Sequence, residues 1–491
     1  MQAQRLPAGM SIEEMLRDEG EKDMSDNERI IGDLVARARM AQAQVADYTQ
    51  EQIDSVCRAV AWQTYCDANI KICAETAVEE TGMGNVADKI TKHKVKVLGS
   101  LVESLKGKTV GLVEENVELG IRKYAKPVGV IGALAPVTNP TATPASNAIA
   151  ILKGRNAMIL APHPKAKKSA KVVCDFMRAG LRSVGAPEDL VQHVAEPTLE
   201  LSQELMRQVD LVLATGGPGV VKAAYSSGTP AYGVGAGNAV AIVAEDADVE
   251  DAAKKIHLSK VFDHATSCSS ENSIVVQESV YGALMDGLHA QGAYVCSAAE
   301  KDALEKVIWV PNKDGVFGIN GKVVAQSAEK IAGMAGIQIP AGTRMLAVEC
   351  ADAHANSRWR GEKLSPVLTV WRYKNFDEAL DIVKTLTDYA GTGHSSGIHT
   401  FNAGYIEKLA LAQKSSRIMV RQPMAPGNGG NFFNGMPSTT SLGCGTWAGN
   451  STTENIHWKH FINVTWVSEP FKPVRPADDE VWGAFWKEFG K

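Results

Sequence analysis

The chain has 491 residues, of which 45% are hydrophobic and 22% charged, and its formal net charge is −5. This composition is that of an ordinary globular protein, and the acidic balance gives no support to nucleic-acid binding, which requires a basic surface. No apolar run approaches the roughly 20 residues of a membrane span, and the N-terminus lacks the order of a signal peptide, so we predict a cytoplasmic protein. Because a single core stops growing near roughly 250 to 300 residues, we expect two main lobes.

The first 26 residues are charged, and we predict a mobile segment with one short amphipathic turn at Ile12, Met15 and Leu16. As an alternative, this turn could be a docking peptide for encapsulation in a bacterial microcompartment. From 27 to about 105, apolar residues recur with helical spacing, as in IIGDLVARARMAQAQV, which predicts a helix-rich part. The stretch 109–129 alternates apolar and polar residues and predicts two strands of a hairpin or ribbon.

Short, wholly apolar runs separated by helical patterns follow: VGVIGALAP, NAMILAP, DLVLATG and AVAIVAE. Buried strands that alternate with crossover helices are typical of a parallel doubly wound sheet, so 128–241 is predicted to be a dinucleotide-type domain. A second α/β pattern runs from about 250 to 440, with SIVVQ, PVLTVWRY, GIHTF and RIMVRQ as strand candidates. The aromatic tail HWKHFINVTWVSEPF is predicted to be a strand that pairs with another element or another subunit.

The eight cysteines form no CxxC pair, and no Cys/His spacing matches a zinc finger, so we expect free thiols in a reducing compartment. His457 and His460 lie three residues apart, but we interpret them as solvated or interface histidines and predict no metal site. Cys268 differs from the other thiols because it stands in DHATSCSSENS, where small hydroxyl residues give it little apolar burial. Either it lies incidentally in a surface loop, or a substrate reaches it.

Other candidate groups stand at the ends of predicted strands. ATGGPGVVKAAY passes from a strand into a helix through glycines whose N–H groups could bind a phosphate, although GxGxxG is absent and a tight turn is the alternative. Asn139 lies in the rigid turn VTNPTATP, which could hold an amide donor as an oxyanion hole requires. Glu362 precedes an apolar strand in EKLSPVL, and His394 lies in the loop GHSSGIH. Taken singly, each of these has a simpler structural explanation.

Taken together, the chain resembles the CoA-acylating aldehyde dehydrogenases of the aldehyde dehydrogenase superfamily over nearly its full length after about residue 27. The resemblance rests on VTNPTATP, LKGRNAMILAPHPKAKKS, ATGGPGVVKAAYSSGTPAYGVGAGN, FDHATSCSSENS, GEKLSPVL, GTGHSSGIH and SLGCGTWAGN, in that order. Within the group, ATSCSSENS and GNGGNFFNG are most like the acylating sulfoacetaldehyde dehydrogenases, with acylating succinate-semialdehyde and acetaldehyde enzymes as near neighbours.

The resemblance implies an α/β fold with two doubly wound domains and a β oligomerisation ribbon, assembled as a dimer or tetramer. The expected boundaries are 1–26 for the N-terminal segment, 27–107 and 128–241 for the cofactor-binding domain, 242–445 for the catalytic domain, and 108–127 and 446–491 for the oligomerisation elements.

The resemblance also implies that Cys268 attacks the aldehyde, passes hydride from the resulting thiohemiacetal to nicotinamide, and is left as a thioester. Asn139 and the Cys268 N–H would hold the oxyanion, and a depressed thiol pKa is expected. His394 is the candidate for deprotonating or orienting the CoA thiol, the alternative being that it only lines the channel. Hydrolytic relatives carry a glutamate in an ELGGK-like motif where this chain has YGVGAGN, with Gly233 at the acid's place. Without that base, the thioester should persist until CoA takes the acyl group.

Cofactor residues are implied in the same way. Glu362 would bind the nicotinamide ribose, and the pyrophosphate would lie against Thr215, Gly216 and Gly217. At the adenosine ribose the chain reads HPK, with Pro164 before Lys165 in place of the usual acid, which admits and slightly favours NADP, with NAD as the alternative. The full expected cofactor set is Thr138, His163, Lys165, Thr215, Gly216, Gly217, Gly235 and Glu362.

A sulfonate needs charge-assisted donors near the aldehyde tunnel. The expected substrate residues are His264, Thr266, Arg421 and Asn434, with Asn428 and Asn431 as further possibilities, although PGNGGNFFNG is also what a tight loop would contain. The leading hypothesis is thus CoA-acylating oxidation of a small anionic aldehyde, sulfoacetaldehyde before succinate semialdehyde or acetaldehyde. The alternatives are a hydrolytic aldehyde dehydrogenase and a catalytically silent scaffold or binding protein.

Overall fold

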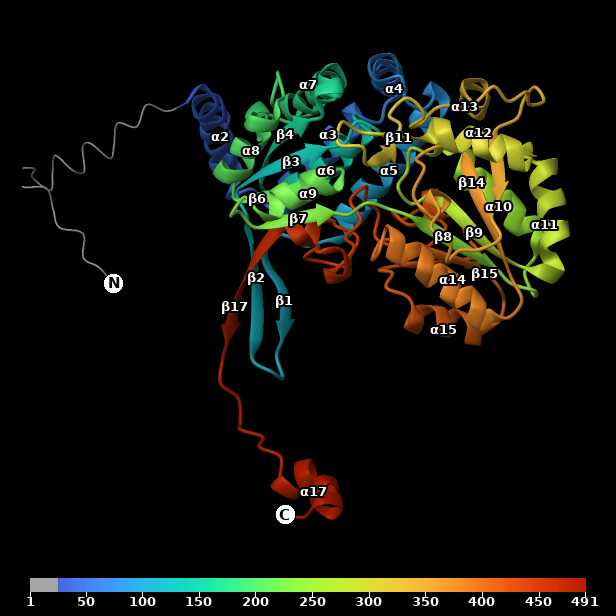
Figure 1. Ribbon diagram of the computed structural model, residues 1–491. Coiled ribbons are helices and arrows are strands. Elements are labelled where there is room, and N and C mark those ends of the chain that lie inside the picture. Colours follow the sequence, from blue (N-terminus) through green and yellow to red (C-terminus); the bar gives the residue numbers. More distant parts are fainter. Residues whose placement is uncertain (1–24) are drawn as a thin grey trace, which may run out of the picture.

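The structure is a computed structural model that describes residues 25–491 (Figure 1). The N-terminal turn expected at Ile12, Met15 and Leu16 lies outside the described residues. Ser25 caps the first described helix through a reciprocal capping box with Glu28. The predicted helix-rich part is confirmed: it consists of α2 (Asp26–Val45), α3 (Gln50–Gln63), α4 (Asp67–Thr81) and α5 (Val86–Lys106).

The first sheet has five parallel strands in the order β5-β4-β3-β6-β7. Every residue of β3 and β4 is buried, as their unbroken apolar sequences predicted. The strands are β3 (Val130–Ala135), β4 (Ala157–Pro162), β5 (Val191–His193), β6 (Leu211–Thr215) and β7 (Ala231–Val234), and the helices between them are α6 (Ala142–Lys153), α7 (Lys167–Ser183), α8 (Leu199–Gln208) and α9 (Pro218–Tyr225).

The second sheet has seven parallel strands in the order β10-β13-β14-β9-β8-β15-β16. Its strands are β8 (Ala239–Val243), β9 (Glu271–Gln277), β10 (Ala293–Val295), β13 (Met345–Glu349), β14 (Val367–Tyr373), β15 (Ser396–His399) and β16 (Ile418–Val420). Its helices are α10 (Val249–Val261), α11 (Glu278–Ala290), α12 (Ala298–Ile308), α13 (Ala328–Met334), α14 (Phe376–Tyr389), α15 (Ala403–Ala412) and α16 (Met424–Gly427), and a small ribbon pairs β11 (Trp309–Pro311) with β12 (Phe317–Ile319). The predicted pair of doubly wound α/β domains is therefore confirmed.

The passage between the two sheets is short. Only residues 235–238 separate the carboxyl end of β7 from the amino end of β8. The carboxyl edge of the first sheet therefore faces the amino edge of the second. The expected boundary between 241 and 242 falls inside β8, which belongs to the second sheet, so it lies a few residues too late. The run AVAIVAE is apolar in either sheet, and its sequence does not distinguish between them.

A three-stranded antiparallel arm, β1-β2-β17, projects from the body (Figure 1). It is formed by β1 (Gly111–Asn116), β2 (Ile121–Pro127) and β17 (Ile462–Ser468), so the predicted hairpin and the predicted pairing of the aromatic tail are both confirmed. Beyond the arm, α17 (Asp478–Phe489) lies apart from the body with no buried residue, and the sequence analysis missed this helix. Among residues 25–491, no helix is both long and apolar enough to cross a bilayer.

The burial of Trp371 in the second sheet predicts that its replacement by alanine strongly destabilises the protein. Trp371 in β14 is buried and donates from Nε1 to Ser273 Oγ at 3.2 Å. We expect Trp371→Ala to lower the free energy of unfolding by about 3 to 5 kcal/mol, because it leaves a large cavity. Urea denaturation followed by circular dichroism measures the change, with Trp62→Ala as the control because Trp62 is 60% exposed. Equal effects of the two substitutions would contradict this assignment of the core.

Candidate active site

The candidate residues meet where the two sheets face each other. Asn139 and Thr215 follow β3 and β6 at the carboxyl edge of the first sheet, whereas Cys268, Glu362 and His394 precede β9, β14 and β15 at the amino edge of the second. Because the strands of each sheet are parallel, their ends align along one edge, and segments far apart in sequence converge on one cleft. The sequence predicted these positions as loop residues, and the topology brings the loops together.

Cys268 and His394 are in direct contact. The distance from Cys268 Sγ to His394 Nε2 is 3.1 Å, and His394 Nδ1 lies 2.8 Å from Ser395 Oγ. An imidazole that carries its proton on Nδ1 donates to Ser395 and leaves Nε2 free to accept the S–H of Cys268. The backbone N–H of Cys268 has no partner among the described residues, so it is free to donate to an oxyanion.

Burial determines the protonation of this pair. Burial raises the pKa of Cys268 to about 12, and the charge of Glu362 acts in the same direction. Burial, together with the charge of Arg417, lowers the pKa of His394 to about 3. At neutral pH the pair is therefore a neutral thiol beside a neutral imidazole. The depressed thiol pKa expected from the sequence is not present, because desolvation outweighs the charge of Arg417.

The loop that carries Cys268 begins with strained backbone. Asp263, His264 and Ala265 have φ values of 49°, 52° and 57°, and three successive non-glycine residues in this region cost on the order of 1 to 3 kcal/mol each. The Asp263 side chain holds the run in place. Its carboxylate accepts from the backbone N–H of Asn85 at 3.0 Å, and its own N–H donates to Asp88 at 2.8 Å.

Two lysines of α5, Lys89 and Lys92, also bind the Asp263 carboxylate, and we call these three residues the lysine anchor. Lys89 and Lys92 form buried ion pairs with Asp263, the first at 3.2 Å, and Lys92 also donates to Thr266 Oγ1 at 2.7 Å. Burial would raise the pKa of Asp263, but the charges of Lys92 and Lys89 outweigh it and lower the pKa below its usual value. Lys89 also lies 3.4 Å from the carbonyl of Thr138, which ties the Asn139 loop to the Cys268 loop. Asn139 itself uses one amide hydrogen on Thr143, at 2.9 Å.

No acid stands beside Cys268 on the segment between the sheets. A Cβ at Gly233 would lie 2.6 Å from the Tyr225 ring and from Val221, so a larger residue there would point into α9. Gly237 is the position that faces the catalytic loop, since its Cβ would meet the Cys268 carbonyl at 2.0 Å. The whole stretch 231–238 reads AYGVGAGN and contains no carboxylate. This segment therefore offers no general base for a water molecule.

The cleft fits a nicotinamide dinucleotide. Glu362 Oε1 is buried without a hydrogen-bond partner, which suits a ribose hydroxyl, and burial raises the pKa of this carboxyl to about 8. At the turn after β6, a Cβ on Gly217 would meet nothing within 4 Å, so the start of α9 is open, and Thr215 Oγ1 lies 3.2 Å from Ser441 Oγ. A cavity of about 540 Å³ extends from α9 past Gly235 to the chain just before His394.

The expected adenosine end lies at the carboxyl end of β4. His163 and Lys165 are both exposed there, and His163 Nδ1 accepts from the Lys165 N–H at 3.1 Å. Two carboxylates lie close by: Glu80 caps α7 at the N–H of Lys168, at 2.8 Å, and Glu196 pairs with Lys167 at 2.6 Å. Lys165 itself has no acidic partner among the described residues.

The structure does not bring Arg421 to Cys268, which corrects the expectation that it binds substrate. Its N–H donates to Ile398 at 2.8 Å, its guanidinium donates to Thr400 at 2.6 Å, and it lies over the Phe401 ring. These contacts are at the carboxyl end of β15, whereas the cysteine lies at the amino edge. The four residues of β15 between the two edges span about 13 Å, at roughly 3.3 Å per residue.

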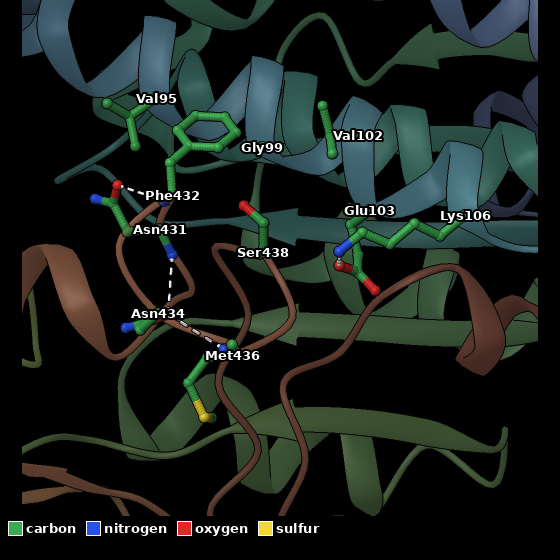
Figure 2. A pocket seen from close by; sticks show the side chains of 11 residues that line it. Val95, Gly99, Val102, Glu103, Lys106, Asn431, Phe432, Asn434, Met436 and Ser438 are labelled. Atoms are coloured by element: carbon green, nitrogen blue, oxygen red, sulfur yellow. Dashed lines mark hydrogen bonds and ion pairs between the residues drawn. The ribbon is translucent and has the colours of Figure 1, made fainter.

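Two other expected substrate residues are engaged in the protein. Thr266 is buried, and its hydroxyl donates to Asp263 at 2.8 Å, so it belongs to the lysine anchor. Asn434 donates to Gln422 and to the Gly427 carbonyl, at 2.8 and 3.0 Å, and shapes its own loop. Asn431 and Asn434 line a cavity of about 230 Å³ between this loop and α5 (Figure 2). His264 is half-buried within the strained run, and burial lowers its pKa.

The sequence analysis missed Arg417. Its side chain is 4% exposed and donates to the carbonyls of His394 at 2.9 Å and Thr453 at 3.0 Å. No acidic partner among the described residues offsets its charge, which stabilises a thiolate at Cys268. It lies just before the run IMV of β16, where it reads as an ordinary strand flank.

The comparisons with known proteins agree with this site. Residues 23–454 match the aldehyde dehydrogenase family model, so the chain belongs to the aldehyde dehydrogenase family. It is 58% identical over 459 residues to a sulfoacetaldehyde dehydrogenase of an Acholeplasma species, covering 94% of this chain and 95% of that protein. It is 54% identical over 464 residues to the acylating sulfoacetaldehyde dehydrogenase of Bilophila wadsworthia, covering 94% and 100%.

Solved structures place it among acylating members of the family. An acetylating aldehyde dehydrogenase from Geobacillus thermoglucosidasius has a TM-score of 0.87 and 33% identity, covering 92% of this chain and 98% of that one. A Rhodopseudomonas palustris propionaldehyde dehydrogenase with bound propionyl-CoA has a TM-score of 0.79 and 26% identity, covering 89% and 94%.

The raised pKa of Cys268 predicts how its reactivity depends on pH. In cofactor-free protein, the rate of alkylation by iodoacetamide should rise by about tenfold per pH unit from pH 7 to 10, because only the thiolate reacts. Mass spectrometry of the peptide that contains Cys268 measures the rate, and the half-buried Cys66 is the internal reference. A plateau below pH 9 would show that the thiol is already ionised there and would contradict the neutral pair.

Proposed function

We propose that this chain oxidises sulfoacetaldehyde in the presence of CoA, with sulfoacetaldehyde, CoA and NADP⁺ giving sulfoacetyl-CoA, NADPH and a proton. The observation that carries the proposal is the 3.1 Å contact between the Cys268 thiol and the neutral His394, beside a segment that contains no carboxylate. Two relatives more than half identical over almost the whole chain bear the name of this activity. Succinate semialdehyde receives less support, since the relative named for it is 40% identical.

The chain's own residues account for the first half of the reaction. Nε2 of His394 takes the thiol proton as Cys268 attacks the aldehyde carbon, and the oxyanion is held by the Cys268 N–H and by Asn139. The nicotinamide supplies the hydride acceptor when bound. Collapse of the oxyanion, with loss of hydride to that acceptor, then leaves a thioester on Cys268. His394 releases the thiol proton to solvent, which is the proton of the overall reaction, and is neutral again before CoA enters.

The second half of the reaction depends on which nucleophile can be activated. His394 is neutral and lies against the sulfur, so it can accept the proton of an incoming CoA thiol. Water reaches the same thioester without an activating carboxylate from segment 231–238, and Glu362 is largely protonated at neutral pH because its pKa is raised to about 8. A thiol is intrinsically the better nucleophile, so CoA takes the acyl group.

We propose NADP as the preferred cofactor, with NAD as the alternative, because Lys165 is exposed at the adenosine end and no acid accompanies it in HPK. We also propose that the arm joins protomers into a dimer or tetramer, since Trp466 on β17 is 62% exposed. All eight cysteines are free thiols, which supports the cytoplasm as the expected compartment, with a microcompartment as the alternative.

The dependence on CoA tests the reaction type. Purified protein with sulfoacetaldehyde and either NADP or NAD should produce reduced cofactor at steady state only when CoA is present, because the thioester otherwise accumulates. Absorbance at the reduced-nicotinamide band measures the rate, and acetaldehyde and succinate semialdehyde are compared in parallel. Steady turnover without CoA would show that water deacylates the enzyme and would overturn the proposal.

The role of the thiol is tested by Cys268→Ser. We expect turnover to fall by about a thousandfold or more, because the hydroxyl is a far weaker nucleophile. Cofactor binding, followed by quenching of protein fluorescence, should be retained, since the cofactor contacts lie elsewhere. Cys57→Ser is the matched control on a fully buried thiol in α3. Retained turnover in Cys268→Ser would remove Cys268 from its role.

A further inference from the structure

The buried side of α5 is unusual for a helix that packs against a protein core. A core-facing stripe is normally apolar, yet this one carries the buried side chains of Lys89, Lys92 and His93, and the half-buried Lys96 lies one turn further along. Lys89 and Lys92 have a clear function, because both form ion pairs with Asp263. Lys96, one helical turn further along, has none of these contacts.

Lys96 holds its charge without an acidic partner. Its ammonium donates to the carbonyls of Gly429 and Gly430, at 2.9 and 3.1 Å, and it forms no ion pair with any residue of 25–491. Burial, together with the charge of Lys92, lowers the pKa of Lys96 to about 8, so it stays largely protonated at neutral pH. Lys96 is half-buried, so its charge is only partly solvated and has no counter-ion among the described residues, and an anionic ligand would offset that charge.

The position of Lys96 relates it to the reacting sulfur. Lys92 donates to Thr266, which stands two residues before Cys268. Lys96 is four residues after Lys92 in α5, a distance of about 6 Å along the helix axis. In sulfoacetaldehyde the sulfonate is on the carbon next to the aldehyde, so its cation must lie close to the loop that carries the thiol. The carbonyl partners of Lys96 are Gly429 and Gly430 in the loop PGNGGNFFNG. Later residues of this loop line the cavity against α5, whereas Lys96 does not line it (Figure 2).

We infer that Lys96 is the residue that recognises the anionic end of the substrate. This inference rests on the proposed function. A lysine ammonium has three donors, and the two carbonyls use two of them, which leaves one N–H and a full charge for a sulfonate oxygen. Lys92 supports the same site through its charge, since it shares the single carboxylate of Asp263 with Lys89. Arg421, at the opposite end of β15, does not take part.

The test compares a charged and an uncharged aldehyde. In Lys96→Met, kcat/KM for sulfoacetaldehyde should fall by about 10- to 100-fold, mainly through KM, because one charge-assisted hydrogen bond is lost. The same variant should keep acetaldehyde turnover within about threefold, which also shows that it folds. Lys96→Arg should restore part of the lost activity. Lys94→Met is the matched control, since Lys94 lies on the other side of α5 and pairs with Asp67 at 2.7 Å.

A second readout uses an unreactive anion. Ethanesulfonate should inhibit the acetaldehyde reaction of the unaltered protein competitively, and its inhibition constant should rise by about tenfold or more in Lys96→Met. Equal losses on both aldehydes, or unchanged sulfoacetaldehyde kinetics, would overturn the assignment of Lys96. Failure of the unaltered protein to use sulfoacetaldehyde while it acylates acetaldehyde would instead overturn the proposed substrate.

Discussion

The active site depends on the buried ion pairs between Asp263 and the two lysines of α5. Asp263 starts a left-handed run that an isolated chain would avoid, and its carboxylate collects enough donors to hold the run in place. Breaking a buried ion pair from one side typically costs about 3 to 5 kcal/mol, because the remaining charge is left uncompensated. The lysines come from α5 in the N-terminal helical part, whereas Asp263 lies between α10 and β9 of the second sheet. The same interaction therefore shapes the catalytic loop and joins the helical part to the second sheet.

Burial of Cys268 and His394 determines the protonation state of both side chains. Burial keeps Cys268 as a thiol and His394 as a neutral imidazole at neutral pH. Such a pair is unreactive toward stray electrophiles in comparison with a preformed thiolate. The nearest cation, Arg417, is held by carbonyls and remains available to stabilise the sulfur anion as it forms.

The sequence predicted the sheets well because buried parallel strands are continuous apolar runs, and it predicted Cys268, His394 and Glu362 as loop residues at strand ends. It could not show the 3.1 Å contact of Cys268 with His394, which depends on how distant strands align. Arg421 was assigned to the substrate from its charge alone, and the register of β16 places it at the wrong edge. Lys96 and Arg417 were missed because helical and strand patterns are usually read from apolar residues. The signal for Lys96 was available as polar residues repeating on the packed face of α5.

The short crossing at 235–238 limits how the two halves can move. Gly237 fits against the Cys268 carbonyl and Gly391 against Asn238, with no space for a side chain at either glycine. Residues 235–238 and the loop that carries Cys268 are therefore closely packed against each other. A displacement of one sheet relative to the other would therefore carry the Cys268 sulfur along with residues 235–238.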